Sequence, residues 1–407
     1  MSQHVITRLG HQGDGIAEGP VFAPLTLPGE VVSGALINQT LTDIRILTPS
    51  PDRVVAPCRH FKSCGGCQLQ HASDGFLAIW KQDIVQTALQ AHGIAVDFLP
   101  IHISPPQSRR RATFAVRRTK KGALAGFHAR ASDTIIEIPE CKLLHPDLMR
   151  ALPAASDLAL AGASRKTGIS VTVTRSLAGL DVAVADGKPL DGPLRGTLAA
   201  LAERHDLARL AWDDEMVVAQ RAPEQLFGTA RITPPPGAFL QATAEGEAAL
   251  LAETEKILAG ARRIVDLFAG CGTFALPLAR TAEVHAVEGD AMMTEALDRG
   301  WRKSQGLKTV TTEARDLFRR PLLPGDLARF DAAVIDPPRA GAEAQIAEIA
   351  RARLPRLAYV SCNPTTFARD AKTLLAQGYV MGPLRVVDQF RWSAHVELVA
   401  GFTLNPL

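Results

Sequence analysis

The sequence has no run of about 18 uninterrupted apolar residues, the length that a membrane-spanning helix requires. Its first residues, MSQHVITRLGHQGDG, lack a basic region followed by an apolar core, so they do not resemble a secretory signal. Six cysteines in 407 residues are too few for a disulfide framework. These absences argue against a membrane protein and a disulfide-stapled secreted domain, and they predict a cytoplasmic location.

A strong charge of one sign is also absent, because 45 Lys and Arg residues nearly balance 42 Asp and Glu residues and leave a net charge of +3. Overall charge therefore neither requires nor excludes a nucleic-acid partner. The apolar fraction of 46% and the charged fraction of 21% are typical of a globular protein. The length is sufficient for two or three domains.

The sequence pattern predicts three domains. Residues 1–56 alternate short β-rich pieces with glycine and proline turns, which indicates a small β-barrel. Residues 57–232 combine a helical stretch with strand-like pieces, and three cysteines open this mixed α+β segment. Residues 233–407 alternate strands and helices, which predicts an α/β domain with a doubly wound, mostly parallel sheet.

A glycine turn follows the strand RIVDLF in the last segment. Gly270 and Gly272 let the backbone approach a ligand, but a turn of this kind also fits a loose dinucleotide fingerprint. Asp266 on that strand suits a cationic ligand group, and Glu288 at the end of the next strand can hold two ribose hydroxyls. A helix cap and an ordinary strand carboxylate are the alternatives. The arrangement resembles the class I S-adenosylmethionine-dependent methyltransferases.

The segment VIDPPRAG (334–341) adds an acid and two prolines at the end of a later strand. The prolines stiffen the loop, so Asp336 reaches the site at low entropic cost. The segment resembles motif IV of nucleic-acid methyltransferases, and a plain strand-end turn is the alternative.

Cys362, in VSCNPTTFARD, follows the next strand and precedes a helix. Carbon 5 of a pyrimidine is a poor nucleophile until a thiolate adds to carbon 6, so Cys362 is a candidate nucleophile. The helix N-terminus is expected to lower the pKa of its thiol. Glu397, on a late strand in HVELVAGF, is the candidate base that removes the carbon 5 proton after methyl transfer.

The segments DPPRAG, VSCNPTTFARD and HVELVAGF together resemble the RNA uracil-5-methyltransferases, which form 5-methyluridine in transfer and ribosomal RNA. The resemblance implies a nucleophile at Cys362 and a base at Glu397. It also implies contacts to S-adenosylmethionine from Gln241, Phe268, Thr273, Glu288, Asp316 and Asp336. Thr243 stands where the family has asparagine, and Arg391 and Trp392 replace the family's proline stretch in DQFRWSAHVE.

Cys58, Cys64 and Cys67 are clustered around a glycine pair, and Cys141 is the other free cysteine in this half of the chain. Four thiolates suit zinc or a [4Fe–4S] cluster equally well. The segment CGGCQLQH is similar to the iron–sulfur segment of the subfamily that methylates U1939 of bacterial 23S ribosomal RNA. That resemblance implies a [4Fe–4S] cluster and an rRNA substrate.

RNA contact is expected at residues 108–121, SRRRATFAVRRTKK, which contain seven basic residues and no acid. Their cations can neutralise phosphates, and Phe114 is expected to stack on a base, although a solvated strand face is the alternative. The N-terminal segments LGHQGDGIAEG and LPGEVV resemble a TRAM domain, an OB-type RNA-binding barrel. We expect a monomer that binds RNA.

Other functions remain open at this point. A transfer-RNA substrate is one, and an RNA cytosine-5-methyltransferase is another, although Arg339 stands where such enzymes typically have a second cysteine. An iron–sulfur oxidoreductase using NAD is a more distant alternative, because it leaves Cys362, Asp336 and the TRAM-like barrel unexplained. A non-catalytic RNA-binding protein is a further alternative.

Overall fold

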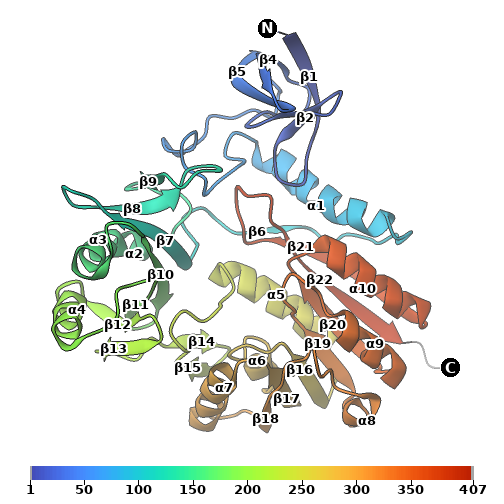
Figure 1. Ribbon diagram of the computed structural model, residues 1–407. Helices are drawn as coiled ribbons and strands as arrows, with labels where there is room; N and C mark the ends of the chain where they lie inside the picture. The colour runs from blue at the N-terminus through green and yellow to red at the C-terminus, as the bar shows by residue number, and fades with distance from the viewer. Residues whose placement is uncertain (1, 405–407) are drawn as a thin grey trace.

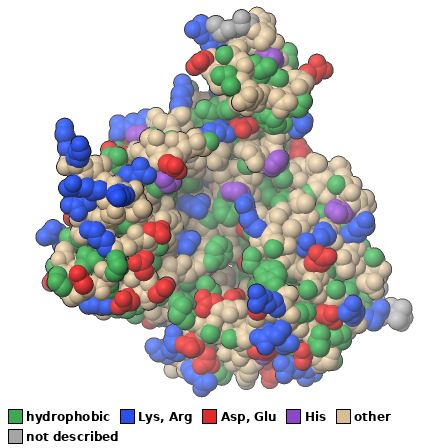
Figure 2. All heavy atoms as spheres, in the orientation of Figure 1, with side chains coloured by type: hydrophobic (Ala, Val, Ile, Leu, Met, Phe, Trp, Pro, Cys, Tyr) green, Lys and Arg blue, Asp and Glu red, His purple; other side chains and the backbone are tan. Residues whose placement is uncertain are grey.

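The computed structural model describes residues 2–404, in which a closed barrel, two large sheets and their helices form three parts around a hollowed face (Figures 1 and 2). The small barrel lies at the top of Figure 1, the second sheet at the left and the largest sheet at the lower right. None of the helices in residues 2–404 has both the length and the hydropathy that crossing a membrane requires.

The N-terminal part is a closed five-stranded barrel, as the sequence predicts. Its strands, in barrel order, are β1 (Ser2–Leu9), β2 (Gly15–Ala17), β3 (Val21–Ala23), β5 (Thr40–Thr48) and β4 (Val31–Ile37). The barrel closes because β1 pairs with both β2 and β4. Gly15 is required in this small interior, since a Cβ there would lie 2.1 Å from Thr26 Oγ1.

The central part is a seven-stranded sheet with helices on one face. Its strands, in sheet order, are β13 (Glu215–Ala219), β12 (Leu207–Trp212), β11 (Gly179–Ala185), β10 (Ile169–Ser176), β7 (Arg111–Arg118), β8 (Ala123–His128) and β9 (Ile135–Glu137). Its helices are α2 (Pro146–Met149), α3 (Ala151–Gly162) and α4 (Gly192–Arg204), and the hairpin of β14 (Gln225–Phe227) and β15 (Ala230–Ile232) leads into the last part. Helices α3 and α4 pack on the sheet through alanine and leucine side chains, which form one apolar core with the strands.

The last part is an eight-stranded sheet. Its strands, in sheet order, are β18 (Val310–Ala314), β17 (Glu283–Glu288), β16 (Arg263–Leu267), β19 (Ala332–Ile335), β20 (Arg356–Ser361), β22 (Glu397–Leu404), β21 (Tyr379–Asp388) and β6 (His102–Ile103). The five strands from β18 to β20 are parallel, and β22 is antiparallel to its neighbours. This is the predicted doubly wound sheet, and its order reverses between β16 and β19, where such sheets bind ligands.

Two apolar cores sandwich this sheet because successive strand residues face opposite sides, as Ala358 and Tyr359 do on β20. The helices of this part are α5 (Ala244–Ile257), α6 (Ala275–Leu278), α7 (Ala291–Lys303), α8 (Pro324–Leu327), α9 (Glu343–Ala352) and α10 (Pro364–Ala376). The helical stretch that the sequence predicts within residues 57–232 is α1 (Asp74–Gln90), which follows the N-cap Ser73. It packs against α10, and its Val85 and Leu89 are buried in the core of the large sheet.

Candidate active site

Three of the predicted site residues meet at one edge of the large sheet. Asp336 follows β19 and Cys362 follows β20, so both lie at the carboxyl ends of parallel strands. Glu397 begins β22, which runs the opposite way and pairs Leu398 with Ser361. This register brings the Glu397 carboxylate beside the Cys362 thiol, and each of the two carboxylates raises the pKa of that thiol.

The Cys362 thiol is not acidified as the sequence predicts. Burial, followed by the charges of Glu397 and Asp336, raises its pKa to about 12, and the nearby Arg339 only partly opposes them. The expectation that the N-terminus of α10 lowers the pKa is therefore wrong for the protein alone. Burial of the sulfur, together with the two carboxylates close to it, outweighs the partial positive charge of one helix end.

A chain of side-chain amides joins the two carboxylates. Gln241 Nε2 donates to Asp336 Oδ2 at 3.0 Å, and Gln389 Nε2 donates to Gln241 Oε1 at 2.5 Å and to Glu397 Oε2 at 3.0 Å. Gln241, Gln389 and Glu397 are each 3% exposed or less. Gln389 is not among the site residues that the sequence predicts, although a glutamine just after a buried strand and eight residues before Glu397 was a signal for it.

Both carboxyl groups are held away from their ordinary titration range. Burial raises the pKa of Asp336 to about 7, although the hydrogen bond from Gln241 lowers it. Burial and then the charge of Asp336 raise the pKa of Glu397 well above its usual value, and the Gln389 amide opposes this. A carboxyl whose pKa lies near or above neutrality is suited to proton transfer.

The remaining predicted donor contacts lie along the same edge, towards β18. Phe268, just after β16, has φ 62°, and Glu288 ends β17 with its carboxylate accepting hydrogen bonds from the amides of Gly270 and Asp290 at 3.0 Å each. Asp316 follows β18, and its Oδ1 accepts from the Phe318 amide at 3.0 Å. Thr273 is in the glycine turn after β16, two residues before α6 begins.

Asp266 is the least satisfied group in this region. Its side chain is fully buried on β16, and neither carboxylate oxygen has a hydrogen-bond partner within residues 2–404. Burial, and then Asp336 and Glu288, raise its pKa well above the usual value, and the nearby backbone amide of Ala275 opposes them only in part. A buried carboxyl group without a hydrogen-bond partner, next to the glycine turn, fits a site for a cationic group.

Thr243, which replaces the family's asparagine, has a structural role. Its hydroxyl accepts from the Gly246 amide at 3.0 Å and so caps α5, and it lies 2.7 Å from the Ser104 hydroxyl. The substitution therefore leaves the helix start intact.

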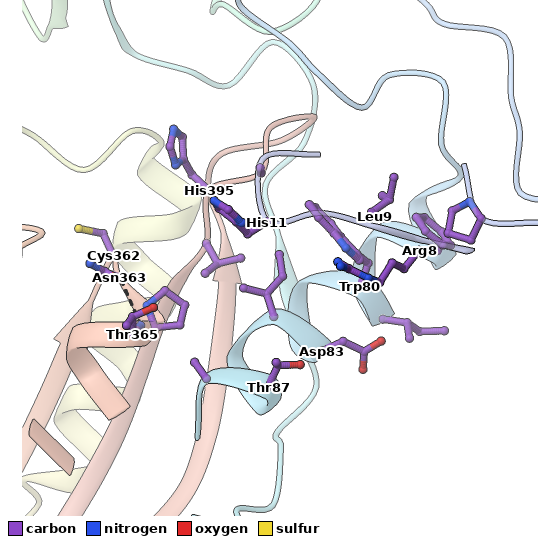
Figure 3. A pocket seen from close by; sticks show the side chains of 18 of the residues that line it. Arg8, Leu9, His11, Trp80, Asp83, Thr87, Cys362, Asn363, Thr365 and His395 are labelled. Carbon is purple, nitrogen blue, oxygen red and sulfur yellow. Dashed lines mark hydrogen bonds between the residues drawn. The ribbon is translucent and has the colours of Figure 1, made fainter. Parts of the chain in front are cut away.

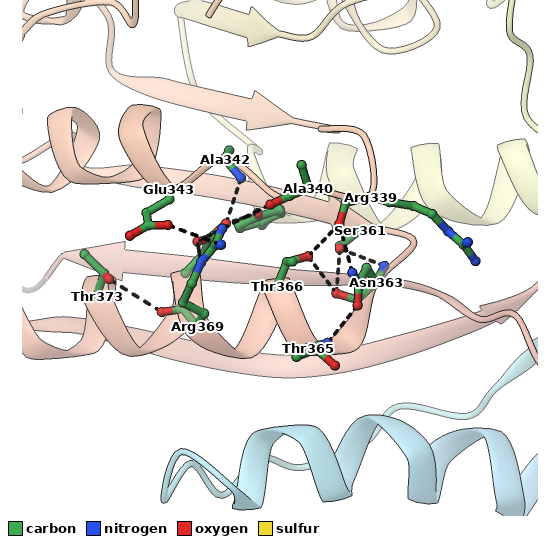
Figure 4. Close-up of polar contacts among 12 residues, drawn as sticks. Arg339, Ala340, Ala342, Glu343, Ser361, Asn363, Thr365, Thr366, Arg369 and Thr373 are labelled. Atoms are coloured by element: carbon green, nitrogen blue, oxygen red, sulfur yellow. Dashed lines mark hydrogen bonds and ion pairs between the residues drawn. The ribbon is translucent and has the colours of Figure 1, made fainter. Parts of the chain in front are cut away.

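The loop after Asp336 is fastened to the turn that carries Cys362 (Figure 4). The Arg339 carbonyl accepts from Asn363 Nδ2 at 2.8 Å and from the Thr366 hydroxyl at 3.3 Å. The Arg339 guanidinium reaches away from these bonds and meets His395 Nδ1 at 2.6 Å. Two strand-end loops and the segment before β22 thus hold one another around the thiol.

A cavity of about 1120 Å³ leads from Cys362 to the barrel. Cys362 and His395 lie at one end of it, and Trp80 of α1 and Arg8 of β1 lie at the other, with His11 between them (Figure 3). The thiol is therefore reached from the space that the barrel, α1 and the large sheet enclose.

The four predicted cluster cysteines surround a second, small cavity. Cys58, Cys64, Cys67 and Cys141 line it together with apolar side chains. Burial, followed by the other three thiols, raises the pKa of the Cys67 thiol to about 12, and a hydrogen bond to Gln70 opposes them. As placed, no three Cys, His, Asp or Glu side chains within residues 2–404 are close enough to hold one metal ion. The donor set is nevertheless four sulfurs facing one space, which fits a cluster or a zinc ion.

The basic segment at residues 108–121 divides into an internal and an external half. Arg110 is buried, forms an ion pair with Glu247 and donates to the Gln241 carbonyl at 3.0 Å. Phe114 is fully buried in the core of the central sheet, so the prediction that it stacks on RNA is wrong. The cations of Arg117, Lys120 and Lys121 are on the outer half and are exposed.

The strand order, the glycine turn and the edge occupied by Asp336 and Glu288 define a class I methyltransferase fold. Residues 303–405 match the family model described as tRNA (Uracil-5-)-methyltransferase. The solved structure of Pyrococcus abyssi tRNA (uracil-54, C5)-methyltransferase in complex with S-adenosyl-L-homocysteine has a TM-score of 0.78 with this chain. The match covers 98% of this chain and 99% of that one at 22% identity, so it supports the fold.

Closer relatives match over almost their whole length. An RNA methyltransferase of Rhizobium meliloti is 46% identical, covering 97% of each chain, and one of Brucella suis is 44% identical, covering 98% of this chain and 97% of that protein. The 23S rRNA (uracil(1939)-C(5))-methyltransferase RlmD of Pseudomonas putida is 34% identical, covering 98% of this chain and 92% of that protein. The chain belongs to the family of RNA uracil-5-methyltransferases.

Proposed function

We propose that this protein forms 5-methyluridine in 23S ribosomal RNA, with Cys362 as the nucleophile and Glu397 as the base. The observation that carries the proposal is the thiol of Cys362 beside two buried carboxylates at the carboxyl edge of a methyltransferase sheet, next to its switch point. Methylation of a uridine carbon needs a nucleophile, a bound methyl donor and a base at one point, and this edge offers a residue for the first and last roles and a set of residues to hold the donor.

Cys362 and Glu397 act on the ring in sequence. The Cys362 thiol passes its proton to a neighbouring carboxylate and its sulfur bonds to carbon 6. The electron pair of the carbon 5–carbon 6 double bond then forms the bond from carbon 5 to the methyl group, which leaves its former bonding pair on the donor sulfur. Glu397 then takes the proton from carbon 5, the double bond re-forms, and the carbon–sulfur bond breaks with its electron pair returning to Cys362. The raised pKa of Glu397 makes its carboxylate a strong base for this step.

The methyl donor fits the edge from Gln241 to Asp316. Bound S-adenosylmethionine supplies a methyl group on a positively charged sulfonium. In our proposal Asp336, Gln241, Phe268 and Thr273 lie around the reacting end of the donor and Glu288 and Asp316 hold its nucleoside end. Asp336 is suited to its place because a buried carboxylate favours a neighbouring cation, and Glu288 because backbone amides fix its carboxylate.

A [4Fe–4S] cluster held by Cys58, Cys64, Cys67 and Cys141 is part of the proposal. Support comes from the four thiols that line one cavity with apolar neighbours. Gly65 has no room for a side chain, since a Cβ would lie 2.8 Å from the His128 carbonyl of β8. The cysteine segment is thereby joined to the central sheet, and the cluster would order it there.

The RNA substrate is assigned from charge and from the relatives. The cavity between barrel and Cys362 and the exposed cations of the central sheet offer a path for RNA, with residues 1–56 and 57–232 as RNA-binding domains and 233–407 as the catalytic domain. The Pseudomonas putida relative named as a 23S rRNA enzyme supports rRNA. Transfer RNA is the second candidate, because the matching family model carries that substrate in its description.

The decisive experiment maps 5-methyluridine in total RNA from a strain that lacks the protein. We expect one 23S rRNA uridine to lose its methyl group and to regain it when the wild-type chain, but not Cys362→Ala, is supplied. Loss of the methyl group from transfer RNA instead would select the second candidate. Unchanged 5-methyluridine in both RNAs would contradict the proposed function.

A further inference from the structure

The amide of Gln389 has a fixed orientation between the two halves of the site. Its Oε1 accepts from the Ala242 amide at 2.8 Å, and a backbone N–H can only donate, so the NH₂ group must face the other way. That NH₂ group uses its two hydrogens on Gln241 Oε1 and Glu397 Oε2. The side chain is 1% exposed, and all of these bonds are shielded from water.

Glu397 depends on this contact. Within residues 2–404, Gln389 is the one side chain that donates a hydrogen bond to the Glu397 carboxylate. The titratable groups that face Glu397 are Asp336 and Cys362, and neither offers a positive charge to balance it. A carboxylate buried to 3% exposure with a single donor is strongly affected by loss of that donor.

We propose that Gln389 is a positioning residue for the base, holding the Glu397 carboxylate beside Cys362 and linking it through Gln241 to Asp336. The proposal rests on the proposed function, since it concerns the step at which Glu397 removes the carbon 5 proton. The bonded Gln389 N–H stabilises the ionised form of Glu397, which is the form that accepts this proton. The electron pair of the carbon–hydrogen bond then re-forms the ring double bond and releases the Cys362 thiolate.

The test is the Gln389→Met variant, which keeps the size of the side chain and removes its donors and acceptor. Single-turnover reactions with S-adenosylmethionine and a uridine-containing 23S rRNA fragment would measure methyl transfer and decay of the covalent protein–RNA adduct separately. We expect adduct decay to slow by about tenfold or more at pH 7, while methyl transfer changes less. Decay should approach the wild-type rate as pH rises, because loss of the donor raises the pKa of the base.

The matched control is Gln225→Met, which removes a buried amide that donates to the Arg175 carbonyl at 2.8 Å in the central part. It should leave both rates and the pH profile as in the wild type. If Gln389→Met does not fold, Gln389→Asn keeps the amide but shortens its reach, and the same slow decay is expected.

Three results would overturn the assignment of Gln389. The first is a folded Gln389→Met protein whose adduct decays at the wild-type rate. The second is an equal reduction in the rates of methyl transfer and adduct decay with no shift of the pH profile, because a residue with only a structural role would give that result. The third is a wild-type protein that makes no 5-methyluridine in any RNA, which would overturn the proposed function as well and so is distinguishable from the first two.

Discussion

Substitution of Glu397 is expected to stop the reaction at a later step than substitution of Cys362, after the methyl group has been transferred. Glu397→Gln keeps the shape and the bond to Gln389 but cannot accept the carbon 5 proton, so the methylated ring stays bonded to Cys362. We expect a protein–RNA adduct that survives denaturation in a gel, with turnover reduced by about 10²-fold or more. Glu253→Gln, a largely buried carboxylate on α5 that pairs with Lys256 and Arg385, is the control and should form no lasting adduct. An adduct-free Glu397→Gln enzyme would assign the base elsewhere.

The raised pKa of Asp336 makes the free energy of unfolding depend on pH. Its pKa is raised from an ordinary value of 3.8 to about 7, so the folded protein holds a proton that the unfolded chain has released. The stabilisation is complete below about pH 4 and is lost as pH rises towards 7, with a slope of at most about 1.4 kcal/mol per pH unit for one carboxyl. Urea unfolding of the protein without S-adenosylmethionine, at pH values between 4.5 and 7.5, would measure how the free energy of unfolding depends on pH. Asp336→Asn should flatten the dependence, and an unchanged slope would contradict the raised pKa.

The elements around the site differ in how far the sequence predicts them. The strand RIVDLF, the DPP loop and Cys362 were predictable because parallel strands align their carboxyl ends whatever their neighbours are. The burial of Phe114 was readable too, since Ala112, Phe114 and Val116 alternate with outward residues on β7. The two-residue strand β6 has no such period, and only tertiary contact with β21 makes it a strand.

The role of Gln389 also depends on a tertiary contact, which limits how far the sequence predicts it. The place of Gln389 near Glu397 in the sequence is a local signal, but its orientation depends on a hydrogen bond from the Ala242 amide, which is 147 residues away in the chain and cannot be inferred from a local pattern. Likewise Thr243 reads as a lost asparagine in the sequence, whereas its place at the start of α5 makes it a helix cap.

Helix α1 is joined to the active-site segment by one buried lysine. Lys81 is fully buried, forms an ion pair with Asp388 at the end of β21, and donates to the carbonyls of Phe390 and His395 at 3.1 and 3.0 Å. Removing one partner leaves a buried charge without compensation. Lys81→Met is therefore expected to reduce the free energy of unfolding by about 3–5 kcal/mol in a urea titration.

The double variant Lys81→Met with Asp388→Leu separates charge from packing. Because it removes both charges, we expect it to recover most of the loss seen in Lys81→Met. A double variant as unstable as the single one would show that the lysine acts through its carbonyl contacts alone.

At the scale of the whole molecule, the proposed cluster joins the cysteine segment to the central sheet. Protein purified without oxygen should be brown and contain about four iron and four acid-labile sulfide per chain, by metal and sulfide analysis. Cys67→Ser should lose the iron, whereas Cys271→Ser should retain it, because Cys271 is buried in the core of the large sheet. A colourless, zinc-containing and active preparation would contradict the cluster.

The outer end of the central sheet carries unpaired cations at some distance from Cys362. Arg117, Lys120 and Lys121 are exposed where β7 turns into β8, and no ion pair involves them within residues 2–404. The loop with Arg165 and Lys166 emerges beside them, since Ile169 pairs with Val116. Lys and Arg side chains gather at this end, at the left of Figure 2.

Strand β7 connects this basic end to the site, because Arg110 just before it contacts Glu247 and the Gln241 carbonyl. At about 3.3 Å per residue, the strand from Arg110 to Arg117 is roughly 23 Å long. Only an RNA with several nucleotides beyond the target uridine can therefore contact both the active site and the basic end. Changing Arg117, Lys120 and Lys121 to Glu should weaken RNA binding, and the plot of log affinity against log salt should become shallower by about 2–3. The methylation rate at saturating RNA should stay near the wild-type value.

A control tests whether position or total charge matters. Arg280, Lys308 and Lys372 are exposed cations of the large-sheet part, and their change to Glu alters the net charge equally. If the basic end binds RNA phosphates, the first set weakens binding of a long fragment far more than the second, and a short oligonucleotide shows no such difference. Equal losses of RNA affinity for both sets would mean that RNA is attracted only by the net charge of the protein. Binding at a contact surface depends on where the charges lie, whereas long-range attraction depends on their sum.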